Sequence, residues 1–167
     1  FTVIFMQHRI HRKRGFTVVE LLIASLIISA TTFALISASQ KGVALSYRAL
    51  HSVQASFLAE EGAEAVKTIR DGGWSSISSI VVDTPYVLVF NTQTNTWSLS
   101  TTSSNPIDSL FTRVVILSDV YRNSSDDIAE TGTLDTRTKK VTVRVTFPSS
   151  EGLVTKEIIF YISDIFT

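Results

Sequence analysis

The sequence contains no cysteine, which excludes a disulfide framework, thiol catalysis and a cysteine-bound metal. Histidine is almost as scarce. His8 and His11 precede a long apolar segment and His51 follows it, so the many serines lack a general base. We therefore expect no enzymatic activity. A domain without disulfides must be held together by burial of apolar side chains, and such residues recur in strand-like clusters after position 80.

Charge is missing from one long stretch. Between Gly15 and Lys41 the only charged side chain is that of Glu20. Residues 18–36 would rise about 28 Å as a helix, which is close to the hydrocarbon thickness of a bilayer. This predicts a transmembrane helix rather than a buried core helix. A cleaved secretory signal is the other alternative, but its small residues would follow the apolar run, whereas here the candidate cut at Gly15 precedes it.

Basic residues gather just before this helix. Arg9, Arg12, Lys13 and Arg14 have no acid among them, and the rest of the chain carries eleven basic against fifteen acidic residues. Because positive flanks stay in the cytoplasm, we expect everything after Lys41 to lie outside it, on a single-pass protein of the inner membrane. The acidic remainder does not offer the basic face that nucleic acid requires.

A short motif surrounds Glu20. Residues 15–20 read GFTVVE and are followed by LLIA, which resembles the class III signal of type IV pilins and type II secretion pseudopilins. The resemblance implies that a prepilin peptidase cuts between Gly15 and Phe16, removes a leader of residues 1–15, and methylates the new amine of Phe16. Met6 is the only methionine, and we expect translation to begin there.

The resemblance also implies a role for Glu20 in subunit registration. An acid in a membrane helix opposes insertion by about 2.5–3.5 kcal/mol at the bilayer centre and by less near an end. In a filament, the Glu20 carboxylate would face the Phe16 amine of a neighbouring subunit. A simpler alternative is that Glu20, one turn from the helix start, reaches the lipid headgroups.

The helix is expected to continue to about Arg70. Residues 16–40 are its transmembrane and filament-core part, and residues 41–71 are an amphipathic stalk that ends at Asp71, Gly72 and Gly73. We expect an apolar stripe along the stalk, with its residues three, four or seven positions apart. It is formed by Val43, Tyr47, Leu50 and Phe57 and continued by Leu58, Ala65, Val66 and Ile69.

Acids on the stalk form no expected metal site, because no histidine accompanies them. We interpret Glu60, Glu61 and Glu64 as solvated helix surface, with Glu64 spaced to pair with Lys67.

Strand patterns fill residues 74–167. Residues 86–91 and 96–99 predict a hairpin, and residues 111–122 predict a long strand or a strand with a bulge. Residues 138–147 alternate apolar and polar side chains, and a closing strand at 154–164 follows a turn at 148–152. The expected fold is α+β: an antiparallel sheet with one face covered by the stalk helix, which is also what the pilin resemblance implies.

Three polar segments are interpreted as connections. Residues 75–79 and 100–104 are serine-rich and are expected to be loops. Residues 123–130, with Asp119 and Asp135 nearby, contain enough oxygen ligands to consider calcium, but they lack the spacing of a calcium loop, so we favour a plain solvated connection.

The expected function is that of a minor pilin or pseudopilin. Its partners are other pilin or pseudopilin subunits, the prepilin peptidase and the inner membrane, and no cofactor is implied. Segments 59–71 and 138–147 loosely resemble minor pilins, whereas a major pilin subunit is the closest alternative. A DNA-uptake pilin would need an exposed cluster drawn from basic residues of the sheet: Arg137, Lys139, Lys140, Arg144 and Lys156. An anchored hydrolase or binding module is the last alternative.

Overall fold

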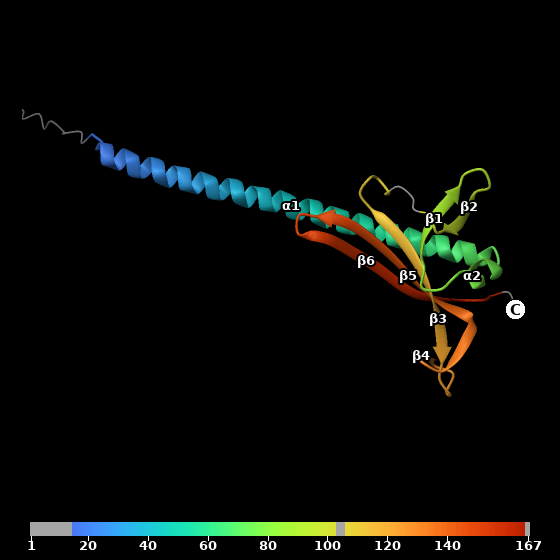
Figure 1. Ribbon diagram of the computed structural model, residues 1–167. Helices are drawn as coiled ribbons and strands as arrows, with labels where there is room; N and C mark the ends of the chain where they lie inside the picture. The colour runs from blue at the N-terminus through green and yellow to red at the C-terminus, as the bar shows by residue number, and fades with distance from the viewer. Residues whose placement is uncertain (1–14, 103–105, 166–167) are drawn as a thin grey trace, which may run out of the picture. The chain divides into compact units, whose positions relative to one another are not determined.

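The computed structural model describes residues 15–102 and 106–165. It contains two helices, α1 (Val18–Asp71) and α2 (Ser75–Ser78), followed by a sheet (Figure 1). The strands are β1 (Pro85–Asn91), β2 (Thr96–Ser100), β3 (Thr112–Arg122), β4 (Ile128–Ala129), β5 (Thr133–Ser149) and β6 (Gly152–Ser163). The α+β arrangement predicted from the sequence is confirmed.

Contacts within the chain define two compact units, divided between Val43 and Ala44. We call them the N-terminal unit and the C-terminal unit. The second half of α1 therefore belongs to the same unit as the sheet.

α1 ends at Asp71, as the glycines that follow it predicted. The Gly72 N–H donates to the carbonyl oxygen of Thr68 at 3.1 Å, and the Gly73 N–H donates to that of Arg70 at 2.9 Å. Gly73 has a φ of 140°, a conformation that side chains rarely adopt. The last carbonyl groups of α1 thus accept hydrogen bonds from the N–H groups of the two glycines, an arrangement that is common at helix ends.

The loop predicted at residues 75–79 is wrong, because the structure forms α2 there. Ile77 is fully buried in the core, so burial of one apolar side chain holds a serine-rich turn in helical form. The second predicted loop covers residues 100–104. Its first residue, Ser100, is the last residue of β2, and residues 103–104 lie outside the described part of the chain.

The sheet is antiparallel, with the order β2-β1-β3-β5-β6 and β4 added to β3. The predicted hairpin is confirmed, since β1 and β2 pair from Asn91 opposite Thr96 onward. The long strand predicted at residues 111–122 is present as β3, and the irregularity in its pairing lies on β5, where residues 136–138 are inserted between the partners of Asp119 and Val120. β5 and β6 are longer than expected and pair without a shift up to Ser149 opposite Gly152.

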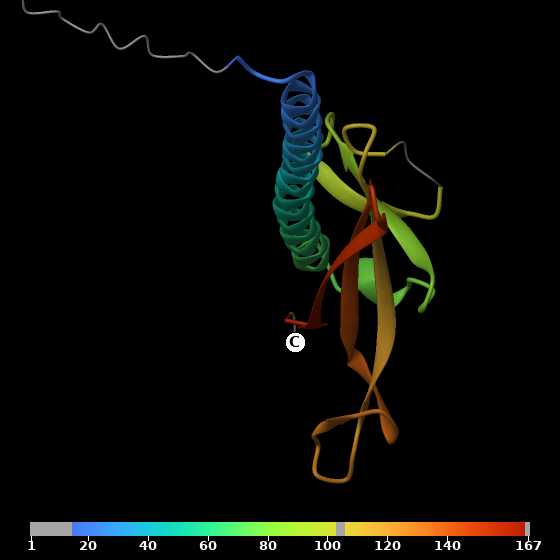
Figure 2. The same cartoon turned by 90° about the vertical axis from the view of Figure 1, so that its left-hand side faces the viewer.

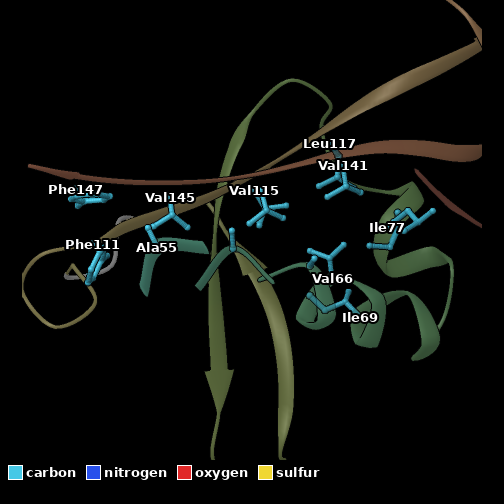
Figure 3. Close-up of a cluster of buried hydrophobic side chains, with 14 residues drawn as sticks. Ala55, Val66, Ile69, Ile77, Phe111, Val115, Leu117, Val141, Val145 and Phe147 are labelled. Atoms are coloured by element: carbon cyan, nitrogen blue, oxygen red, sulfur yellow. The ribbon is translucent and has the colours of Figure 1, made fainter. Parts of the chain in front are cut away.

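One face of the sheet packs against the second half of α1, and both views agree on this (Figures 1 and 2). Figure 3 shows side chains from the two layers pointing toward one another, including Val66 of α1 and Val115 of β3. The alternation predicted for residues 138–147 is confirmed, because Val141, Val143 and Val145 are fully buried. The sheet thus buries one face, as its sequence pattern required.

The apolar stripe predicted for the stalk is only partly correct. Val66 and Ile69 are buried, but Tyr47, Leu50 and Phe57 are 60%, 52% and 65% exposed. The buried helix face instead uses small residues at spacings of four and three: Ala55, Ala59, Gly62 and Val66. Small side chains let the helix backbone approach the sheet closely, which large ones at the same positions would prevent.

At Gly62, α1 lies close to the sheet. A Cβ atom on Gly62 would lie 2.8 Å from Cγ1 of Val143 and 3.1 Å from Cδ of Arg113. Arg113 is itself buried, at 9% exposure. Its Nη1 donates to the carbonyl oxygen of Leu58 and to Oε2 of Glu61, both at 3.0 Å. The charged side chain of Arg113, on the sheet, therefore holds α1 by hydrogen bonds to its backbone and to Glu61.

Removing this arginine tests how the helix is held. We expect Arg113→Ala to lower the free energy of unfolding by about 3 kcal/mol, because it leaves a cavity and removes the contacts to α1. Arg113→Met should cost about 1 kcal/mol, since methionine fills similar space without a buried charge. Urea denaturation of the two variants measures the difference. Equal losses in both would show that the charged contacts, and not the packing, hold the helix.

Candidate functional site

The start of α1 is closed by a reciprocal cap. Thr17 precedes the helix, and its Oγ1 accepts a hydrogen bond from the Glu20 N–H at 3.3 Å. The Thr17 N–H in turn donates to Oε2 of Glu20 at 3.4 Å. This is the capping-box pattern, in which a threonine and a glutamate three residues later each satisfy a backbone donor of the other. Both bonds are near the long limit, so the cap is weak.

The sequence interpretation missed this local role of Glu20. The TVVE spacing of residues 17–20 was the signal that could have revealed it. An acid in the first turn also interacts favourably with the helix dipole. Glu20 therefore has a local structural role, and any role between subunits adds to it.

Gly15 and Phe16 precede α1 and are exposed. The Phe16 side chain is 82% exposed, and a Cβ atom on Gly15 would meet no atom within 4 Å. Residues 1–14, which make up nearly all of the predicted leader, lie outside the described residues. The peptide bond between Gly15 and Phe16 is thus accessible in the structure.

The N-terminal unit presents an apolar surface. Its α1 segment contains a window long and apolar enough to cross a membrane, with mean hydropathy 2.2 and no residue buried. Large side chains such as Leu26 and Phe33 are 70% and 74% exposed. Burying such a side chain is favourable by about 1.5–3 kcal/mol, so this surface requires a cover of lipid or protein.

Polar residues within this apolar segment are satisfied by the helix itself. The hydroxyls of Ser25, Ser29 and Thr32 each donate to a backbone carbonyl three or four residues earlier, at 2.8 Å. Hydroxyls bonded in this way are tolerated in a membrane helix. Glu20 remains the one charged side chain between Gly15 and Lys41.

The C-terminal unit leaves a second apolar surface uncovered, on its segment of α1. It is formed by Tyr47, Leu50, Val53 and Phe57, each at least 52% exposed. Their spacings of three and four residues place them along one side of the helix, and the residues that pack on the sheet lie on another. We call these four residues the outer stripe. Leu50, Val53 and Phe57 have the three-then-four spacing of a helix-packing seam, and Tyr47 lies about one turn before them.

The basic residues considered for DNA do not come together. Lys139 is 8% exposed and pairs with Asp119, whereas Arg144 pairs with Glu157. Lys156 lies opposite the buried Val145 and so points to the helix side of the sheet, while Lys140, one residue from Lys139, points to the other side. Lys139 and Lys156 thus face the helix side of the sheet while Lys140 and Arg144 face the other side, so these four residues do not form one basic surface.

The segment considered for calcium is organised by an arginine. Within residues 15–102 and 106–165, no group of three or more His, Asp or Glu side chains could hold a metal ion. Oδ2 of Asp135 accepts from Nε of Arg122 at 2.7 Å, and Asp126 lies 3.7 Å from the same Nε. Two of the acids that suggested calcium, Asp126 and Asp135, are therefore partners of Arg122, and a third, Asp119, pairs with Lys139.

This pair predicts a pH dependence. The hydrogen bond from Arg122 lowers the pKa of Asp135 below its usual value. A lowered pKa stabilises the folded state above the unfolded-state value of about 3.9, and this contribution is lost as the pH falls through the folded pKa. We expect the amide protection factors at the end of β3 and the start of β5 to fall below about pH 4. Asp135→Asn should remove most of that fall, and a fall unchanged in this variant would contradict the assignment.

His51 and the acidic helix residues have structural contacts. The His51 ring packs edge-on against Phe111 and Phe147, with centroid distances of 6.0 and 5.9 Å. The predicted pair of Glu64 with Lys67 is confirmed at 2.7 Å. Glu61, interpreted as solvated surface, also binds Arg113.

Comparison of the chain with protein-family models, curated proteins and solved structures returns no significant match.

Proposed function

We propose that the chain is a minor pilin or pseudopilin, a structural subunit that is anchored in the inner membrane and assembled through its N-terminal helix. The observation that carries the proposal is the apolar surface of the N-terminal unit, which is uncovered and contains a single carboxylate near its start. The GFTVVE motif and the basic residues before it support the same function.

Lipid alone accounts for the apolar residues but not for Glu20. A carboxylate is disfavoured in lipid by up to about 3.5 kcal/mol. A cation at about 4 Å attracts it by about 4 kcal/mol at an effective dielectric of 20, which is enough to offset that cost. After cleavage, the Phe16 amine of a neighbouring subunit supplies such a cation in the proposed filament. An isolated subunit lacks this partner, so it is biased toward assembly.

The outer stripe offers a further contact for assembly. Tyr47, Leu50, Val53 and Phe57 are exposed on a helix that already buries another face against its own sheet. Soluble domains seldom leave a row of large apolar side chains uncovered without a partner. Packing against the helix of another subunit would cover the row.

Processing is tested at Gly15. We expect Gly15→Leu to leave the leader attached, because the bulkier residue obstructs the peptidase at the bond that follows it. Mass spectrometry of the membrane-extracted protein distinguishes the precursor from the mature form. Thr17→Ser, which keeps the capping hydroxyl beyond the cut, is the matched control and should be cleaved normally. A mature protein starting at Phe16 in Gly15→Leu would contradict the proposed cleavage site.

The choice between filament types rests on phenotype. Deletion of the gene should abolish or reduce surface filaments if the subunit serves a pilus, and secretion if it serves a pseudopilus. Loss of DNA uptake alone would favour a competence pilin, for which the dispersed basic residues of the sheet give no support.

A further inference from the structure

A recess of about 730 Å³ lies in the C-terminal unit between the last turn of α1, α2 and β2. Figure 1 shows these elements near the C-terminal end of α1. Its apolar lining comes from Ile69, Ile80, Trp97 and Leu99, and most of its other lining residues are serines and threonines. The volume falls within the range of binding sites in proteins.

The recess follows the free edge of the sheet. β2 is the first strand in the sheet order and pairs only with β1. Residues 95–99 line the recess without interruption. Because successive residues of a strand point to opposite faces, an uninterrupted run is the lining expected of a recess along the strand edge. We expect unpaired peptide N–H and C=O groups of that edge to face the recess.

Apart from its short length of five residues, this edge has none of the usual protection against strand pairing. β2 reads TWSLS, without a charged residue or proline, and its register with β1 has no bulge. The opposite edge strand, β6, carries Lys156 and Glu157 near its middle. Charges, prolines and bulges are the devices that keep sheet edges from pairing with another chain. β2 is thus the edge that remains open to an added strand.

Trp97 provides a fixed apolar platform in the recess. Its ring centroid lies 5.0 Å from that of Phe90 and 5.8 Å from the guanidinium carbon of Arg113. A ring held on two sides can receive a side chain with little loss of its own freedom.

The charge of the lining limits what can enter. Among the residues that the structure describes, Asp71 is the one charged residue that lines the recess, and its side chain is 52% exposed. Asp71 forms an ion pair with Arg70, whose two hydrogen bonds both go to Oδ1. No lysine or arginine within the described ranges lines the recess. An acidic occupant would find no partner here, whereas a basic side chain could bind Asp71.

We propose that this recess binds an extended, neutral or basic segment of a partner protein, which adds to β2 as a further strand. The main chain of the segment pairs with the free edge of β2, and its alternate side chains lie on Trp97, Ile80 and Leu99. Such strand addition takes its affinity from main-chain hydrogen bonds and its specificity from pockets for alternate side chains. The site is independent of the proposed filament role.

The test uses a defined peptide and the full chain in detergent. The heptapeptide KKVTVRV, copied from residues 139–145, is basic and has strand-like alternation. Its comparison peptides are EEVTVEV, with the charge reversed, and KKVPVRV, with a proline that cannot donate to a strand. Fluorescence anisotropy of labelled peptide measures binding.

Two serines of α2 supply matched variants. Ser76 lines the recess, whereas Ser78 is exposed and does not line it. We expect Ser76→Tyr to fill the recess and weaken KKVTVRV binding at least about tenfold, while Ser78→Tyr changes it less than about twofold. Asp71→Asn should weaken the binding of KKVTVRV by about threefold.

Each outcome decides the proposal. Binding of KKVTVRV that exceeds both comparison peptides and is lost in Ser76→Tyr supports it. Absence of binding, or binding that Ser76→Tyr leaves unchanged, overturns it. Stronger binding of a neutral oligosaccharide such as maltoheptaose, lost in Ser76→Tyr, would also overturn it by assigning the recess to a sugar.

Discussion

Replacing Gly62 with valine is expected to lower the free energy of unfolding of the C-terminal unit by about 3 kcal/mol. Even a single Cβ atom at this position would lie 2.8 Å from Cγ1 of Val143, which is itself fully buried. Val143 is β-branched and belongs to a central strand, so it cannot turn away cheaply. The added side chain therefore pushes α1 away from the sheet. Urea denaturation followed by near-ultraviolet circular dichroism measures the loss.

Gly42→Ala is the control for this substitution. Gly42 lies in the same helix, but a Cβ atom there would meet no atom within 4 Å. Alanine should then strengthen the helix by up to about 1 kcal/mol through propensity alone. If Gly62→Val stayed within about 0.5 kcal/mol of the parent chain, the close packing of α1 on β5 would be wrong.

Replacing Glu20 separates its two roles. We expect Glu20→Ala to be cleaved normally but to enter filaments at least about tenfold less, because a contact worth about 1.4 kcal/mol or more is lost. Alanine removes both the cap on Thr17 and the negative charge. Glu20→Gln keeps a side chain that can complete the capping box but has no charge. The registration role predicts that Glu20→Gln fails as Glu20→Ala does.

The measurement compares the amount of mature subunit in sheared filaments with that in membranes. Thr17→Ala, which removes the capping hydroxyl and keeps the acid, is the complementary control and should assemble nearly normally. If Glu20→Gln assembled normally while Thr17→Ala failed, the acid would act through the cap and the registration role would be abandoned.

Several elements could be predicted from sequence because local chemistry decides them. The glycines after Asp71 end α1, and the polar turn after Asn91 sets the β1–β2 hairpin. The strict alternation around Val143 correctly assigned the buried face of β5. Each of these features depends on a period or a turn residue that no distant contact overrides.

The missed features depend on contacts that a periodicity does not contain. Large apolar residues such as Leu50 form the predicted stripe of the stalk but are exposed, and the face that packs on the sheet uses Ala59 and Gly62 instead. α2 forms because Ile77 finds a place in a core built from remote segments. The recess beside β2 arises only because the end of α1 and an edge strand meet there.

The sequence allowed specific predictions for the candidate site, because the residues concerned lie within six adjacent positions. The motif predicted the roles of Gly15, Phe16 and Glu20 in processing and assembly, which stay predictions. It did not show the bonds between Thr17 and Glu20, which depend on the spacing of the two residues and not on the charge of Glu20.

The most direct test of the filament proposal is the amino-terminal residue of the native protein, determined by sequencing and mass spectrometry of material extracted from membranes and from sheared filaments. If the chain is processed and assembled as proposed, both fractions contain a single mature form that begins with N-methylated Phe16. A native chain that retains the basic residues before Gly15, or that begins beyond Glu20, would contradict it.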